Sequence, residues 1–98
     1  MREFSRKNME ITSVEVKRVK TPGKMKANAG ITIDNAFAIH DIKVIETEKG
    51  RFIAMPNRRR RGGTGYIDIA HPISHEVREE MERRIFEEYD KLPEEESE

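Results

Sequence analysis

The sequence predicts an α+β domain, in which several antiparallel strands come first and one long amphipathic helix comes last. Two observations support this prediction. Residues 24–34 alternate apolar and polar side chains with period two, as a strand with one buried face does. Residues 74–92 instead repeat apolar side chains every three or four positions, as a helix with one buried stripe does. The 98 residues suffice for one domain with a sheet of about four to five strands.

The first predicted strand, residues 10–20, is rich in β-branched side chains but does not alternate cleanly. Val14 and Val16 fall on one face, whereas Ile11 and Val19 fall on the other. A β-bulge, or a strand covered on both faces, would produce this break in parity.

Turn residues separate the first three predicted strands. Pro22 and Gly23 follow the first strand, because proline fixes φ and glycine accepts a positive φ. Asp34 and Asn35 form a tight turn into the third strand, residues 36–46. This strand breaks parity as the first does, which again predicts a bulge or cover on both faces: Phe37 and Ile39 share one parity, and Ile42 and Val44 share the other.

Two shorter strands and the helix complete the predicted fold. A hairpin turn at residues 48–50 leads into a strand at 51–55, and another short strand is expected at 66–69. The helix has Ser74 as its expected N-cap and is ended by Pro93. Its expected buried stripe consists of Val77, Met81, Ile85, Tyr89 and Leu92.

The formal net charge of zero hides a strong polarity along the chain. Residues 1–75 carry a net charge of +7, and residues 76–98 carry −7. Residues 93–98 are expected to form a disordered acidic tail. Residues 1–8 are polar and without pattern, and are expected to be a disordered extension. The predicted folded domain therefore spans residues 9–92.

The most basic segment is an arginine tetrad, Arg58, Arg59, Arg60 and Arg61, in a predicted loop between Pro56 and a glycine-rich stretch. Arginine stays charged near neutral pH, and its planar guanidinium matches the oxygens of phosphate. Four adjacent guanidinium groups repel one another, so a polyanion would stabilise them, and nucleic-acid backbone is the commonest such partner. A solvated loop that keeps the protein soluble is the alternative. Further basic candidates for phosphate contact are Lys24, Lys26 and Arg51, with Arg83 and Arg84 of the helix as secondary ones.

Few side chains fit catalysis or metal binding. The sequence lacks cysteine, which excludes disulfides, thiol catalysis and thiolate metal sites. His71 and His75 are separated by Pro72, and no nearby acid completes a set of metal ligands. We therefore expect no enzymatic activity, no cofactor and no bound metal. The apolar runs are too short to span a bilayer, so a cytoplasmic protein without a membrane partner is expected.

Several motifs resemble the SpoVG family of bacterial septation and sporulation proteins. Residues 11–27 are similar to the opening of the family, and residues 40–45 to its central strand. The segments Phe52-Ile53-Ala54-Met55-Pro56 and Asp68-Ile69-Ala70-His71-Pro72-Ile73 match its two most characteristic motifs in order and spacing. The resemblance covers roughly residues 9–92.

This resemblance implies a small homodimer with a twisted antiparallel sheet and a C-terminal helix. It also implies binding to DNA and RNA, with effects on septation, sporulation and gene expression. Basic residues after the Met-Pro motif are typical of the family, and the arginine tetrad is a richer version of that feature. The motif at residues 68–73 is interpreted as structural, ending a strand and docking the helix.

The expected function is therefore that of a nucleic-acid-binding regulator without a small-molecule substrate. A protein-interaction module of the cell-division or sporulation machinery is the rival interpretation. In that case the arginine tetrad would meet an acidic protein surface. The salt dependence of binding to nucleic acid separates the two interpretations.

Overall fold

The structure is a computed structural model that describes residues 9–20 and 23–93, and this part of the chain forms six strands and one helix. The predicted disordered ends, apart from Pro93, and residues 21 and 22 of the first turn lie outside the described residues. Four strands make an antiparallel sheet in the order β1-β2-β3-β4: β1 (Ile11–Arg18), β2 (Met25–Ile33), β3 (Phe37–Thr47) and β4 (Gly50–Ala54). A second sheet pairs β5 (Asn57–Arg59) with β6 (Tyr66–Asp68), and α1 (His75–Lys91) follows.

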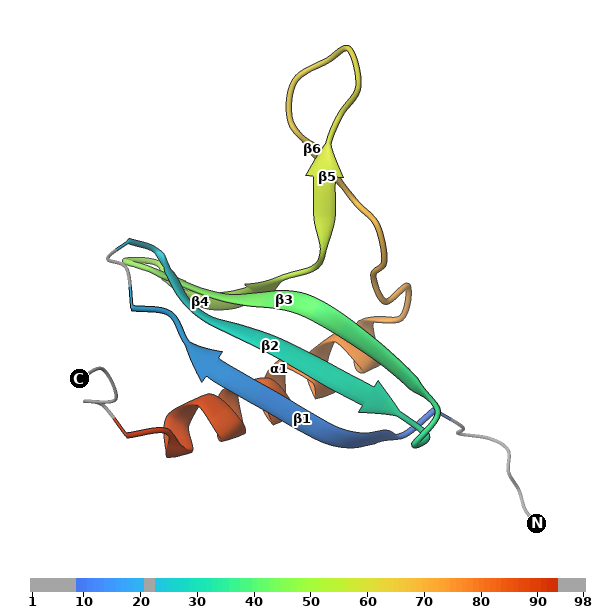
Figure 1. Cartoon of the computed structure of the whole chain (residues 1–98), viewed down its shortest axis with the longest axis vertical. Coiled ribbons are helices and arrows are strands. Elements are labelled where there is room, and N and C mark those ends of the chain that lie inside the picture. The colour runs from blue at the N-terminus through green and yellow to red at the C-terminus, as the bar shows by residue number, and fades with distance from the viewer. Residues whose placement is uncertain (1–8, 21–22, 94–98) are drawn as a thin grey trace.

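The α+β class is therefore confirmed, with one difference from the predicted sheet. The sequence predicted a single sheet of four to five strands, whereas the described residues form one sheet of four strands and one of two. Figure 1 shows α1 lying along one face of the four-stranded sheet, while the β5–β6 hairpin projects away from it. This projection isolates the hairpin from the core.

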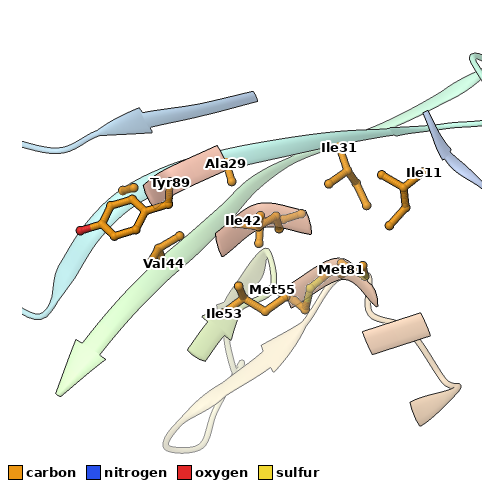
Figure 2. Packing of buried hydrophobic residues seen from close by; sticks show 11 residues of the cluster. Ile11, Ala29, Ile31, Ile42, Val44, Ile53, Met55, Met81 and Tyr89 are labelled. Atoms are coloured by element: carbon orange, nitrogen blue, oxygen red, sulfur yellow. The ribbon is translucent and has the colours of Figure 1, made fainter. Parts of the chain in front are cut away.

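The core lies between α1 and the four-stranded sheet (Figure 2). On β2 the buried side chains alternate as predicted, at Ala27, Ala29 and Ile31. The predicted helix stripe is also confirmed: three of its members are buried, and Val77 and Leu92 pack against the core while partly exposed. The complete set of buried apolar side chains among the described residues is Ile11, Ala27, Ala29, Ile31, Ile42, Val44, Ile53, Met55, Met81, Ile85 and Tyr89.

A bulge explains the break in parity on β1. Ile11 pairs with Ile33, but the next paired residue, Ser13, faces Thr32, so Thr12 is an extra residue. The Thr12 hydroxyl is used locally: it accepts a hydrogen bond from the Asn35 amide at 3.0 Å and donates one to the Thr32 carbonyl at 3.3 Å. The bulge accounts for Ile11, whereas Val19, the other residue of that parity, lies beyond the end of β1 and is partly exposed.

A second bulge explains the break on β3. Ala29 pairs with Ile42 and Ile31 pairs with Ile39, so Gly30 alone faces two residues of β3. The second of these, Asp41, has φ of 61°, a left-handed conformation that aspartate tolerates better than most residues. Both bulges allow apolar residues of opposite sequence parity to reach the same core.

Four arginines, here called the anchoring arginines, join α1 to the sheet. Arg78 donates to the Ile53 carbonyl of β4 at 2.8 Å, and Arg84 donates to the Ile11 carbonyl of β1 at 2.9 Å. Arg51 of β4 makes a bidentate pair with Asp90 at 2.8 and 2.9 Å, and its guanidinium lies 4.6 Å from the ring centre of Phe86.

Arg18, the fourth anchoring arginine, caps the C-terminal end of the helix. Its guanidinium donates to the carbonyls of Leu92 and Pro93 at 3.3 and 3.1 Å, and to the Tyr89 hydroxyl at 3.2 Å. A cation is favourable there because the last helical carbonyls lack intrahelical partners. At the other end, Ser74 is the N-cap, as predicted, and accepts from the Val77 amide at 3.3 Å.

The helix stripe supplies a direct test of the core. Ile85 is fully buried, so Ile85→Ala should reduce the free energy of unfolding by about 2–5 kcal/mol, and Ile85→Val by about 0.5–1.5 kcal/mol. Urea denaturation of the two variants measures both values. A loss below about 1 kcal/mol for the alanine variant would contradict the packing described here.

The Arg51–Asp90 pair predicts a specific pH dependence. The hydrogen bond from Arg51 holds the pKa of Asp90 below its ordinary value, and the hydrogen bond to Asp90 raises the pKa of Arg51. A lowered carboxyl pKa stabilises the fold above the unfolded-state pKa, and this contribution is lost as the pH falls through the folded-state pKa. Asp90→Asn should therefore lower the melting temperature at neutral pH, and the difference should shrink below about pH 4.

The double variant Arg51→Gln/Asp90→Asn is the control for this pair. Its melting temperature should fall less than the sum of the two single changes, because the two groups stabilise each other. A melting-temperature difference for Asp90→Asn that does not change with pH would contradict the assignment.

Candidate nucleic-acid interface

The arginine tetrad lies on the β5–β6 hairpin; the sequence predicted the tetrad's own segment as a loop and also predicted the strand that follows at 66–69, which is confirmed as β6. Arg58 and Arg59 belong to β5 and pair with Ile67 and Tyr66 of β6. Two backbone hydrogen bonds hold the hairpin at its ends, from the Arg60 amide to the Gly65 carbonyl at 3.0 Å and from the Ile69 amide to the Pro56 carbonyl at 2.7 Å. Half of the tetrad therefore sits on a paired strand and half in the connecting turn.

The local sequence explains why the hairpin separates from the main sheet. Pro56 has no amide hydrogen, so it cannot extend the ladder of β4. The Asn57 side chain donates to the Met55 carbonyl at 2.9 Å, across the proline. Gly62 and Gly65 have φ of 69° and 88°, which residues other than glycine rarely adopt, and they allow the chain to return. The sequence prediction missed β5 because four consecutive arginines show no apolar alternation and are typical of a solvated loop.

All four arginines of the tetrad are exposed. Among the described residues, no carboxylate lies within 4.0 Å of their guanidinium groups; the one side-chain contact is Arg58 donating to the Arg59 carbonyl at 3.5 Å. The positive charge of the hairpin is therefore not neutralised by the described part of the protein. An anion that approaches the hairpin meets no competing carboxylate from these residues.

The other predicted arginines have different surroundings. Arg51 is an anchoring arginine, paired with Asp90. Arg83 pairs with Glu80 at 2.9 Å and Glu87 at 3.1 Å, and the hydrogen bond to Glu80 raises the pKa of Arg83. Arg84 is also an anchoring arginine, and it lies 3.9 Å from Glu80. Arg51, Arg83 and Arg84 thus differ from the tetrad in their surroundings, because each already has an acidic neighbour.

The two predicted lysines lie at the start of β2, away from the hairpin. Lys24 is exposed and Lys26 is half-buried. Lys26 is the extra residue of a third bulge, between Met25 and Ala27. No ion pair joins either lysine to an acid of residues 9–20 or 23–93. They therefore form a basic site separate from the tetrad.

An apolar groove of about 560 Å³ lies beside the base of the hairpin, and the sequence alone did not reveal it. Its rim includes strongly exposed apolar side chains: Phe37 and Ile69 are each 63% exposed, and Ile73 is 94% exposed. The groove is lined by Met9, Ile33, Phe37, Ile39, Met55, Ile69, Ala70, His71, Pro72, Ile73, Ser74, Val77 and Met81. The sequence offered one signal for the groove: two isoleucines, Ile69 and Ile73, lie close to Pro72, between the short strand predicted at 66–69 and the helix.

Two of the three histidines, His71 in the groove lining and His75 just after Ser74, have local partners. His75 lies 3.0 Å from Glu79, and Nδ1 of His71 lies 3.1 Å from the Pro72 carbonyl. Across the described residues, no group of three His, Asp or Glu side chains has the arrangement of a metal site. The helix that the structure describes is too short and too polar to cross a membrane.

Comparison with known proteins places this architecture in a family. The family model described as SpoVG matches residues 9–91, which include the sheet, the hairpin and the helix. The chain belongs to the SpoVG family. It is 53% identical over 81 residues to a protein of Agathobacter rectalis, an alignment covering 83% of this chain and 92% of the relative. It is 49% identical over 88 residues to one of Brevibacillus brevis, covering 90% and 92%.

A third relative, from Lachnoclostridium phytofermentans, is 55% identical over 82 residues, covering 84% of this chain and 87% of the relative. All three relatives bear the name "Putative septation protein SpoVG". The two characteristic SpoVG motifs flank the hairpin: residues 52–56 form the end of β4 and its exit, and residues 68–73 run from β6 toward the helix N-cap. In this SpoVG family member the second motif also lines the groove.

Proposed function

We propose that this SpoVG family member is a regulator that binds DNA and RNA through the arginine tetrad. The supporting observation is that four exposed guanidinium groups stand on a projecting hairpin without a carboxylate partner among the described residues. Such a hairpin presents a high density of positive charge to a polyanion. The proposal places Lys24 and Lys26 as additional phosphate contacts, and Arg51, Arg83 and Arg84 as lesser ones.

The helix is a weaker candidate for the main contact. Residues 75–91 carry seven acidic and four basic side chains, so the helix has a net charge of −3. Its four basic residues all pair with acids or with backbone carbonyls. A phosphate backbone laid on this face would meet more repulsion than attraction.

The proposal includes a role in septation or sporulation, inside the cell, through gene expression. It follows the names of the relatives, which are septation proteins by name. The rival proposal is that the tetrad meets an acidic protein of the division or sporulation machinery. It requires the same exposed charge but no affinity for nucleic acid.

We also propose that the protein is a homodimer that uses the apolar groove. Exposed apolar side chains that cluster rather than scatter mark interaction surfaces. Phe37, Ile69 and Ile73 form such a cluster at the groove. The parity breaks at Ile11 and at Ile39 give this proposal no separate support, because bulges account for them. A dimer would present two hairpins to one nucleic acid, so that two weak contacts become one stronger attachment.

Salt dependence tests the role of the tetrad. Changing Arg58–Arg61 to alanine should flatten the slope of log affinity for duplex DNA against log salt, by about 0.9 for each phosphate that is no longer neutralised. The melting temperature should change little, because these exposed arginines have no carboxylate partner among the described residues. Fluorescence anisotropy with a labelled duplex, over a series of salt concentrations, measures the slope.

Two control variants sharpen this test. Changing the same four residues to lysine keeps the charge and should retain most of the slope. Arg83→Ala/Arg84→Ala should weaken binding less than the tetrad change, and should lower the melting temperature because Arg84 anchors the helix. A larger loss of binding from the helix pair would move the main site to α1. Absence of binding to DNA and RNA even at low salt would favour the acidic-protein rival.

Light scattering tests the dimer. The wild-type protein should have twice the protomer mass at low micromolar concentration, and Ile73→Glu should shift it toward the monomer. Ile73 is exposed in the protomer, so this change should leave the fold intact. Thr64→Glu, which adds the same charge on the exposed hairpin loop, is the matched control and should remain dimeric. A monomeric wild type, or a dimeric Ile73→Glu variant, would contradict the proposal.

A further inference from the structure

One face of the four-stranded sheet points away from α1 and bears a row of aligned residues, here called the polar row, which is polar on β1, β2 and β3 and ends at an alanine on β4. Lys17 of β1 pairs with Asn28 of β2. Lys43 of β3 pairs with Asn28 on one side and with Ala54 of β4 on the other. Successive residues of a strand point to opposite faces, and the neighbours of this row are buried against the helix: Ala27, Val44 and Ile53. Figure 1 shows that no described helix or strand covers this face.

An exposed aromatic ring lies beside the row. Phe52 pairs with Ile45 and is followed in β4 by the buried Ile53, so its ring projects from the open face. The side chain is 44% exposed, and nothing in the core requires it there. Ala54, two residues along the same strand, belongs to the polar row. Its cross-strand partner Ile45 shares this face, so the ring stands at the edge of a small apolar area next to the row that carries the lysines. An exposed aromatic ring beside lysines is suited to stacking with a nucleic-acid base.

The charge of this face matches a polyanion. Lys17 and Lys43 lie two strands apart, which separates them by about 10 Å. Glu15, paired with Gly30, is an acid on this face, and Lys17 and Lys43 together outweigh it. The outer face of α1 is acidic in contrast, so the charges of the molecule are segregated between its two sides.

We propose that this open face is a platform for single-stranded nucleic acid, with Lys17 and Lys43 contacting phosphates while Phe52 stacks on a base. The inference rests on the proposed function and adds that single-stranded nucleic acid is preferred to duplex. Bases within a duplex are stacked on each other and cannot reach Phe52, whereas an unpaired base can. The platform therefore favours unpaired segments, while the arginine tetrad contacts backbone of either kind.

The platform and the hairpin are continuous. Ala54 ends β4, and Arg58 follows it by four residues through Pro56. A single-stranded nucleic acid that crosses the sheet along the row from Lys17 toward Ala54 therefore reaches the base of the hairpin. Contacts on both surfaces would act on one nucleic-acid molecule and strengthen each other.

The absence of tryptophan from the sequence permits a direct test. Phe52→Trp places a single fluorescent reporter on the platform. Titration with an oligothymidylate of about 15 nucleotides should quench its emission to saturation, whereas a DNA duplex of the same length should quench it much less. Phe37→Trp is the matched control, because Phe37 lines the apolar groove. Its emission should not respond to either probe.

A second pair of variants tests the platform without changing Phe52. Lys17→Gln/Lys43→Gln should weaken binding of the oligothymidylate about tenfold, and binding of the duplex by less than about threefold. Lys49→Gln/Lys91→Gln removes the same charge from other exposed positions, in the turn before β4 and at the end of α1. This control should weaken both probes by less than about threefold.

The outcomes separate this inference from the function on which it rests. If the tetrad alanine variant weakens both probes while the Lys17/Lys43 pair matches its control, the platform is wrong and the hairpin function stands. If the lysine pair weakens the single strand but the tetrad variant binds both probes normally, the platform stands and the hairpin function fails. Failure of the wild type to bind oligothymidylate would overturn the platform. So would a blue shift in the emission of the Phe52→Trp variant with protein concentration alone, because it would place this face between protein copies.

Discussion

The burial of one helix stripe on one face of a four-stranded sheet is the constraint on which the structure depends. Met81, Ile85 and Tyr89 supply the helical half of the core, and the small side chains of Ala27 and Ala29 leave room for the helix on the sheet. With only six aromatic residues in the sequence and no tryptophan, the protein has few other means of forming a core. Packing the helix on one face also leaves the opposite face open, and the β5–β6 hairpin projects beyond both (Figure 1). The two surfaces proposed to bind nucleic acid are thus those that the core does not use.

The arginines of the sequence have two kinds of surroundings, which sequence position alone does not distinguish. The anchoring arginines donate to carbonyls or to Asp90 and hold the two ends of the helix against β1 and β4. The arginine tetrad has no carboxylate partner among the described residues and stands outside the core. An anchoring arginine that turned toward a ligand would have to break the contacts that position the helix. A tetrad arginine breaks no such contact with the described residues, which is the physical reason for assigning binding to the hairpin.

Most of the fold was predictable because its signals are local. The alternation of Ala27, Ala29 and Ile31 on β2, the helix stripe and the Ser74 cap each depend on nearby residues, and all three are confirmed. For the parity breaks in β1 and β3 the sequence left two explanations, a bulge or cover on both faces, because a sequence does not reveal the partner strand. The pairing of these strands with Thr32 and Gly30 of β2 identifies bulges. The strand β6 was predicted, but β5 was wrongly predicted as a loop, because the pairing of Arg58 with Ile67 crosses a glycine-rich turn without apolar alternation. The partners of Arg51 and Arg84 were beyond prediction, because Asp90 and the Ile11 carbonyl are far away in sequence. The groove was missed for the same reason, since its lining comes from β2, β3, the hairpin exit and α1.

The central claim is that nucleic acid binds mainly the hairpin and the open sheet face, with the helix as a lesser contact. Titration of ¹⁵N-labelled protein with unlabelled oligonucleotide, followed by the shifts of backbone amides, tests it across the whole domain at once. The account predicts the largest shifts in β5, β6 and their connecting turn, with further shifts along the row from Lys17 to Ala54. The amides of α1 around Arg83 should shift much less than those of the hairpin. Shifts centred on Arg83 and Arg84, with the hairpin unchanged, would contradict it.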